Sequence, residues 1–182
     1  MSALHTSPVD FGTLSEPTTL TLQRRLPGPI ERVWSYIMDS DLRSQWLAAG
    51  ALRPQAGASF ELVWRNDTLS ASADERPADF PEESRATCTV TEVEPLRRLT
   101  FEWPGAGVVT FTLDPVGDEV LFTVTHRDLT DRRMRVMVGA GWHMHCDILT
   151  DRLSGSKPAS FWSGWLRLRD EYERRMADAA TV

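Results

Sequence analysis

The first part of the chain predicts a strand followed by two helices. Leucines alternate with threonines over residues 18–26, which is typical of a half-buried strand. Pro29 suits the first position of a helix. Behind it, apolar side chains recur at helical spacing: Ile30, Val33, Trp34 and Ile37. Asp39-Ser40-Asp41 then ends this helix and caps a second, short one over residues 42–46.

From residue 58 the pattern changes to a period of two. Phe60, Leu62 and Trp64 alternate with Glu61 and other polar or outward positions, which predicts a second strand. Residues 66–84 are polar and acidic and contain two prolines, so we expect a long exposed loop, either a lid or a solvated connector. Short turns separate four further strand patterns and favour an antiparallel meander over residues 85–94, 98–103, 107–116 and 118–128.

The last third of the chain predicts two helices. After an Arg-rich turn at residues 131–135 the period returns to 3.6, and Gly155 is placed to stop the first helix. Its apolar stripe consists of Trp142, Cys146, Leu149 and Leu153. The final helix follows Pro158, with an apolar stripe of Phe161, Trp165, Leu168, Tyr172 and Met176. If this stripe were exposed, it would form a large apolar patch on the surface. We therefore expect it to pack either on its own domain or on a partner subunit.

This order predicts an α+β fold in which a curved antiparallel sheet wraps around a long C-terminal helix. We expect a flexible segment at residues 1–16, one domain over residues 17–155, and an additional amphipathic helix within residues 156–182. A gap between such a sheet and its helix is a natural place for a ligand.

Several local patterns, in order, resemble one protein family. They are residues 24–34 at the entry to the first helix, residues 41–46 in the second, residues 94–103 and 125–129 in the meander, and Gly141-Trp142 followed by Asp147, Leu149 and Leu153. Together they resemble the SRPBCC or START-like superfamily, in its branch named after the activator of heat-shock-protein ATPase, over roughly residues 17–176. The chain departs from the family pattern at Gly57, which stands alone where the family has a glycine pair, and at Ala48, which replaces a proline.

The resemblance implies the helix-grip fold, also called START-like or birch-pollen-allergen-like. Members include lipid carriers, polyketide cyclases, hormone receptors and co-chaperone domains. The fold therefore does not select a reaction, and function must be argued from the site.

Composition narrows the range of partners. The formal net charge is −6, which argues against a nucleic-acid or anionic-membrane partner. No apolar run approaches the roughly 18–20 residues that span a bilayer, and no secretory signal is visible at the N-terminus. Cys88 and Cys146 fit reduced, buried thiols, so we expect a cytoplasmic location.

Histidines carry the most plausible chemistry. His126 falls on the inward row of its strand and is the best acid-base candidate, with His145 as its companion and Glu61 as a possible carboxylate. His143 and His145 point about 200° apart on a helix, so they cannot clamp one metal ion, and we expect neither metal nor cofactor. His143 and Asp147 are better explained as a hydrogen-bonded pair. No nucleophile elbow, phosphate loop or dinucleotide motif is present.

The seven tryptophans are the strongest compositional feature. They either fill the core or line an apolar pocket. The predicted ligand-binding residues are Trp64, Phe101, Trp103, Phe122, His126, Trp142 and His145. The leading hypothesis is binding of a small hydrophobic or aromatic molecule without an assigned reaction. Alternatives are a co-chaperone-like module that contacts a heat-shock ATPase, and a cyclase or hydrolase that uses His126 as acid-base. A homodimer is also possible.

Overall fold

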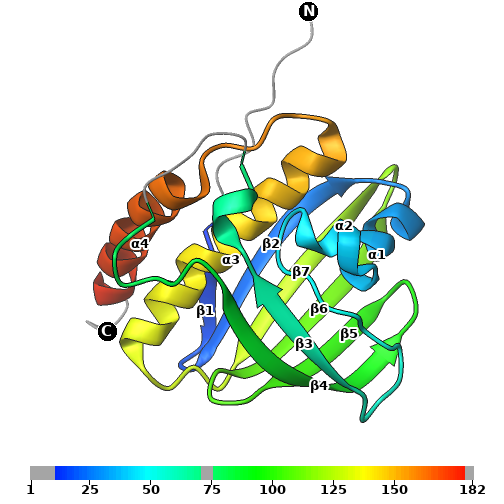
Figure 1. Ribbon diagram of the computed structural model, residues 1–182, viewed down its shortest axis with the longest axis horizontal. Coiled ribbons are helices and arrows are strands. Elements are labelled where there is room, and N and C mark those ends of the chain that lie inside the picture. The colour runs from blue at the N-terminus through cyan, green and yellow to red at the C-terminus, as the bar shows by residue number, and fades with distance from the viewer. Residues whose placement is uncertain (1–10, 71–75, 179–182) are drawn as a thin grey trace, which may run out of the picture.

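The computed structural model describes residues 11–70 and 76–178. In chain order, the elements are β1 (Thr13–Glu16), β2 (Thr19–Pro27), α1 (Ile30–Met38), α2 (Ser40–Ser44), β3 (Ser59–Trp64), a 3-10 turn (Asn66–Thr68), β4 (Ser84–Glu94), β5 (Arg98–Trp103), β6 (Gly107–Val116), β7 (Glu119–Arg127), α3 (Arg132–Ser154) and α4 (Phe161–Asp178). Figure 1 shows α3 running across one face of a curved sheet, with α4 beside it. The predicted α+β helix-grip fold is confirmed.

The sheet is antiparallel throughout, in the order β1-β2-β7-β6-β5-β4-β3. The two end strands do not pair with each other, so the sheet stays open and curved. Its inner face follows the predicted alternation. One buried row crosses four neighbouring strands through direct pairs: Leu22, Val124, Phe111 and Leu99.

The link between α1 and α2 forms as predicted. The Asp39 side chain accepts hydrogen bonds from the backbone N–H groups of Asp41 and Leu42, at 2.9 and 3.0 Å. An arginine fixes the chain that follows, because the buried guanidinium of Arg43 donates to the carbonyls of Ile37 at 2.9 Å and Ala48 at 3.1 Å. Burial of this charge lowers the pKa of Arg43 to about 10.

The long helix α3 begins earlier than the sequence pattern predicted. Asp131 caps it by accepting from the backbone N–H of Met134 at 2.9 Å. Residues 132–135 are therefore helical rather than part of a turn, because arginine is a good helix former once a cap is present. The predicted stop is confirmed, since Gly155 lies in the left-handed region with φ of 73°.

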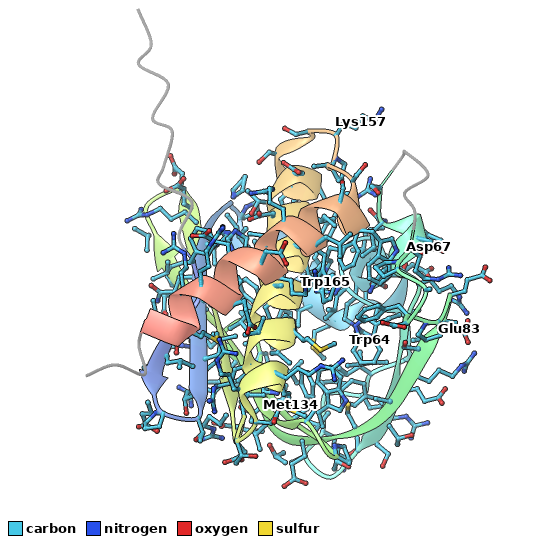
Figure 2. The ribbon with its side chains drawn as sticks, turned by 90° about the vertical axis from the view of Figure 1, so that its left-hand side faces the viewer. Trp64, Asp67, Glu83, Met134, Lys157 and Trp165 are labelled. Atoms are coloured by element: carbon cyan, nitrogen blue, oxygen red, sulfur yellow. The ribbon has the colours of Figure 1, made fainter. Side chains whose placement is uncertain are left out.

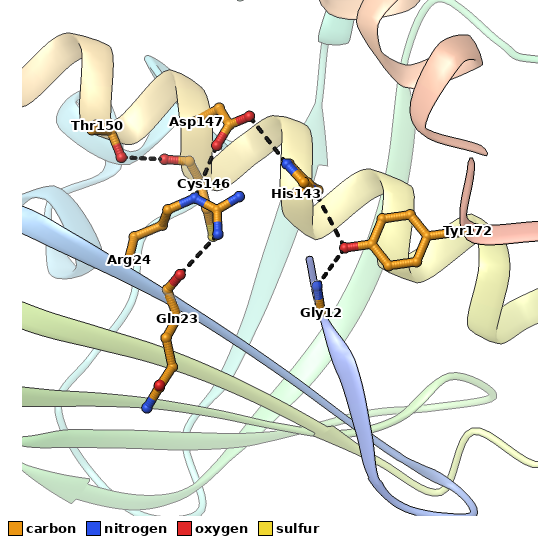
Figure 3. A network of polar contacts seen from close by, with 8 residues as sticks. All are labelled: Gly12, Gln23, Arg24, His143, Cys146, Asp147, Thr150 and Tyr172. Atoms are coloured by element: carbon orange, nitrogen blue, oxygen red, sulfur yellow. Dashed lines mark hydrogen bonds and ion pairs between the residues drawn. The ribbon is translucent and has the colours of Figure 1, made fainter. Parts of the chain in front are cut away.

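The apolar stripe of α4 is buried within the chain. Its members pack against α3 and the segment between β3 and β4: Phe161, Trp165, Leu168, Tyr172 and Met176. A polar network ties this packing together (Figure 3). The hydroxyl of Tyr172 lies 3.1 Å from Nδ1 of His143, and Arg24 Nε donates to Asp147 at 2.9 Å. The stripe is thus covered without a partner subunit.

The N-terminal segment departs in part from the expectation of flexibility. Residues 1–10 lie outside the described residues, whereas Thr13–Glu16 form β1 on the edge of β2. Gly12 donates its N–H to the hydroxyl of Tyr172 at 2.7 Å, and Phe11 packs edge-on against the ring of the same tyrosine. Residues 11–16 are therefore held by contacts with a helix far away in the sequence, which a local pattern does not reveal.

The segment between β3 and β4 is less exposed than expected. Leu69 is buried, and Asp67 accepts a hydrogen bond from Nε1 of Trp162 at 2.7 Å. Phe80 packs on Trp162 and Trp165, with ring centroids 5.2 and 5.0 Å apart. The described parts of this segment are thus attached to α4.

Two further expectations concern the cysteines and membrane-spanning helices. Cys88 and Cys146 are both free and buried, and burial raises the pKa of each thiol. Within residues 11–70 and 76–178, no helix is both long and apolar enough to cross a membrane.

Candidate ligand-binding site

A cavity of about 360 Å³ lies between the inner face of the sheet and the two C-terminal helices. Figure 2 looks at this side of the molecule, where Trp64 from β3 and Trp165 from α4 are labelled. The lining is mainly apolar. Its large side chains are Leu47, Trp64, Phe80, Trp103, Met137, Val138, Trp142 and Trp165. This volume and character are typical of pockets for small organic molecules.

One wall of the cavity is a stack of rings on the inner face of the sheet. Trp64 and Trp103 lie nearly parallel, with centroids 5.0 Å apart and planes 19° apart. Their strands, β3 and β5, flank β4, which contributes the small Ala86 to the lining. The ring of His126 continues the stack, 5.8 Å from Trp103 at 23°. The wall is therefore aromatic.

His126 supports this wall and does not face the cavity. The residue is fully buried, and its Nε2 donates to the carbonyl of Ala106 at 2.6 Å. Its Nδ1 accepts the indole N–H of Trp142 at 3.0 Å. Burial lowers the pKa of His126 to about 4, so the ring is neutral at pH 7. Both nitrogens are occupied, and neither is open to a substrate as an acid or base.

His145 does line the cavity. Its Nδ1 lies 2.8 Å from the carbonyl oxygen of Trp46, and a carbonyl only accepts, so Nδ1 carries the proton. Burial lowers the pKa of His145 to about 4, which keeps the ring neutral. The polar atom that His145 can offer a ligand is Nε2, and it is a hydrogen-bond acceptor.

The predicted site residues divide into two groups. Trp64, Trp103, Trp142 and His145 line the cavity together. Phe101 and Phe122 lie in the core beside it, where Phe101 packs on Phe60 and Phe111, at 5.5 and 5.7 Å, and Phe122 packs on Trp46. Phe101 and Trp103 lie on the same face of β5, as their spacing of two residues predicted. Phe101, however, packs in the core, whereas Trp103 lines the cavity.

The expectation that Glu61 lies beside His126 as a carboxylate partner is not met. Its side chain points to the outer face of β3 and pairs with Arg85 at 3.3 Å. The reason is parity, because its neighbours Phe60 and Leu62 occupy the inward row. No carboxylate of the described residues stands beside His126 as an acid-base partner in the lining of the cavity.

Sequence reasoning missed ten of the lining residues, among them Asn66, Phe80, Gly141 and Trp165. Phe80 is the lone aromatic side chain in an acidic stretch, and that isolation was the available signal. Trp165 was recognised only as part of a docking stripe. Gly141 faces the cavity, and a Cβ built there meets nothing within 4 Å. Asn66 has a side-chain oxygen, Oδ1, that is buried without a hydrogen-bond partner in the described chain.

The two histidines of α3 have different surroundings. The described residues contain no group of three or more His, Cys, Asp or Glu side chains placed to hold an ion. His143 Nε2 lies 3.4 Å from Oδ2 of Asp147, as a pair on one helix face, without forming a well-directed hydrogen bond. His143 instead joins the network with Tyr172 shown in Figure 3.

A second hollow, of about 450 Å³, lies beside the β2–α1 and β6–β7 turns. It is lined by turn residues such as Pro29, Gly117 and Asp118, and it contains no aromatic side chain. The aromatic cavity under α3 is therefore the stronger candidate for an organic ligand.

Comparison with known proteins places the chain in a family. Residues 27–154 match the family described as activator of Hsp90 ATPase homolog 1-like protein. The chain belongs to this family. The resemblance found in the sequence is thereby confirmed. The family match ends at the last residue of α3, so Trp165 is contributed by a helix beyond the matched region.

Solved structures agree with the activator-homolog assignment. A protein from Bordetella parapertussis, solved by NMR in solution, is 36% identical with a TM-score of 0.76, covering 93% of this chain and 95% of that one. CalU16 from Micromonospora echinospora is 22% identical with a TM-score of 0.63, covering 86% of each chain. DynU16, a putative protein in the dynemicin biosynthetic locus, is 22% identical with a TM-score of 0.62, covering 79% of this chain and 49% of that one. The last two show the fold alone. No functionally curated protein matches the chain.

Proposed function

We propose that the protein binds a small hydrophobic or aromatic molecule in the cavity between β3–β5 and the helices α3 and α4, without catalysing a reaction on it. The observation that carries this proposal is the cavity of about 360 Å³ with its lining of four tryptophans and one phenylalanine. A concave, mainly apolar and aromatic lining with a few polar groups is the usual character of a small-molecule site.

The chemistry of the lining favours binding over turnover. The acid-base candidate His126 is occupied at both nitrogens. The thiols Cys88 and Cys146 are buried, and their raised pKa values keep them protonated. A co-chaperone role, suggested by the family name, calls for an exposed docking surface. In the described part of the chain, Val116 is the large apolar side chain with the greatest exposure, at 38%.

The test uses Gly141, because its open space allows a side chain to fill the cavity without straining the helix. The wild-type protein, Gly141→Leu and Gly141→Ala are purified, denatured, and analysed by mass spectrometry for released small molecules. We expect a stoichiometric apolar compound from the wild type and from Gly141→Ala, but not from Gly141→Leu. Gly141→Ala is the matched control, since it changes the same backbone position and leaves most of the cavity free.

An empty wild-type protein that also fails to bind simple aromatic probes would overturn the proposal. In that case, capture of the heat-shock ATPase at micromolar concentration would support the co-chaperone alternative instead. Equal amounts of compound from the wild type and Gly141→Leu would place the bound molecule elsewhere on the protein.

A further inference from the structure

Two polar groups on the cavity wall are hydrogen-bond acceptors that have no donor in the described chain. His145 can present Nε2 to a ligand, because its Nδ1–H is committed to the carbonyl of Trp46 at 2.8 Å. Asn66 has its Oδ1 buried with no partner in the described chain. The indole N–H of Trp142 is already donated to His126. A ligand that donates to either acceptor therefore gains a hydrogen bond that the described chain does not supply.

The lining offers no charge to an ionised ligand. Its described residues include no carboxylate, so an organic cation has no counter-ion there. The cation in the lining is Arg85, and it is already paired with Glu83 at 2.6 Å and Glu61 at 3.3 Å. Transfer of an unpaired carboxylate into such a site is costly. An uncharged molecule is favoured.

The aromatic character of the wall adds a third constraint. The rings of Trp64 and Trp103 stack on each other, with centroids 5.0 Å apart, and a ligand ring beside them finds aromatic partners in offset or edge-to-face geometry. Trp165 and Phe80 stand in the same lining on α4 and on the segment before β4. A planar ring system therefore meets aromatic contacts from both the sheet and the covering elements.

From these three observations we infer that the cavity selects planar aromatic molecules that carry a neutral hydrogen-bond donor, such as a phenol or an aromatic N–H, and discriminates against aromatic carboxylates. This inference rests on the proposed binding function and specifies its ligand class. Asn66 and His145 are the specificity-determining residues.

The test compares three probes with one ring system: 2-naphthol, naphthalene and 2-naphthoate. Their dissociation constants for the wild-type protein are measured by titration calorimetry at pH 7. We expect 2-naphthol to bind about tenfold more tightly than naphthalene, the gain of one hydrogen bond to an unpaired acceptor. It should also bind at least about tenfold more tightly than 2-naphthoate.

Two variants then identify the acceptor. Asn66→Leu and His145→Phe each keep a side chain of similar size and remove one acceptor. The preference for 2-naphthol over naphthalene should fall to about one in at least one of them. Ser84→Ala is the control, because it removes a different polar group from the lining and should leave the preference unchanged. Asn66→Leu should fold as the wild type does, since the Oδ1 atom that it removes has no hydrogen-bond partner in the described chain.

The outcomes separate the two proposals. If none of the three probes binds and the purified protein is empty, the binding function itself fails. If the probes bind but naphthalene or 2-naphthoate binds as tightly as 2-naphthol, the ligand class is wrong and the binding function stands. If the preference survives in both variants, the assignment of Asn66 and His145 is refuted.

Discussion

Gly139 and Gly141 lie two residues apart on α3. We expect replacement of each by alanine to have opposite effects on the stability of the protein. A Cβ built at Gly141 meets nothing within 4 Å, because this position faces the cavity. A Cβ built at Gly139 lies 3.0 Å from Cδ1 and 3.1 Å from Cε1 of Tyr172. Replacement by alanine adds the same methyl group to the same helix in both cases. The environment alone distinguishes the two variants.

The magnitude follows from two terms. Glycine to alanine inside a helix stabilises by about 0.5–1 kcal/mol, and Gly141→Ala should receive this gain in full. At Gly139 the methyl group must displace a ring that is fixed by hydrogen bonds from Gly12 at 2.7 Å and with His143 at 3.1 Å. Overpacking of this kind costs about 1–3 kcal/mol. Gly139→Ala should therefore be less stable than Gly141→Ala by about 1–3 kcal/mol.

Thermal unfolding followed by tryptophan fluorescence compares both variants with the wild type. For a chain of this size, about 1 kcal/mol corresponds to roughly 2–4 °C in Tm. Gly141→Ala should gain about 1–4 °C, and Gly139→Ala should melt about 2–12 °C below it. Equal stability of the two variants would refute the reasoning, because the ring of Tyr172 would then move aside without a cost in free energy. A loss in Gly141→Ala would show that the cavity is filled at this point.

Three further predictions concern buried polar groups. His126→Ala should lose roughly 2–5 kcal/mol, because two hydrogen-bond partners become unpaired; an unchanged Tm would restore a catalytic interpretation. The pKa values of His126 and His145 are lowered to about 4 and that of His143 to about 3, against 6.5 in the unfolded chain, by burial. The unfolded state then binds more protons between about pH 6.5 and 4, so stability falls as pH falls through that window, by up to about 1.4 kcal/mol per pH unit for each histidine. The raised pKa of Asp147 opposes this in part, and a free energy of unfolding that stays flat between pH 7 and 5 would contradict the prediction. Arg43→Lys should destabilise by roughly 2–4 kcal/mol in chemical denaturation, because an ammonium cannot reach every carbonyl that the buried guanidinium now pairs; wild-type stability would show that those bonds contribute little.

Most of the fold was predictable because it follows local periodicity. The inward rows of the strands, the cap at Asp39 and the stop at Gly155 each depend on neighbours within a few residues. Two of the departures depend on distant contacts. The strand β1 is held in place by β2 and by Tyr172 of α4, and Leu69 is buried in a segment whose composition is polar.

The site was predictable only in part. The periodicity of a strand shows which face of the sheet a side chain lies on, but not whether it packs in the core or lines a cavity. Phe101 and Trp103 share the inner face of β5, yet one packs in the core and the other lines the cavity. Which of them meets open space depends on where α3 and α4 cross the sheet, and that crossing is a property of the tertiary packing. Phe80 and Trp165 reach the cavity for the same reason.

Trp142 is held in its place in the cavity wall by its indole N–H. This group donates to Nδ1 of His126 at 3.0 Å, and the bond would be lost if the indole moved into the cavity. A buried indole N–H without a partner costs about 1–3 kcal/mol. The bond between Trp142 and His126 therefore keeps this part of the wall in place. A ligand entering such a preformed cavity orders few additional side chains, so more of its contact energy remains as binding affinity.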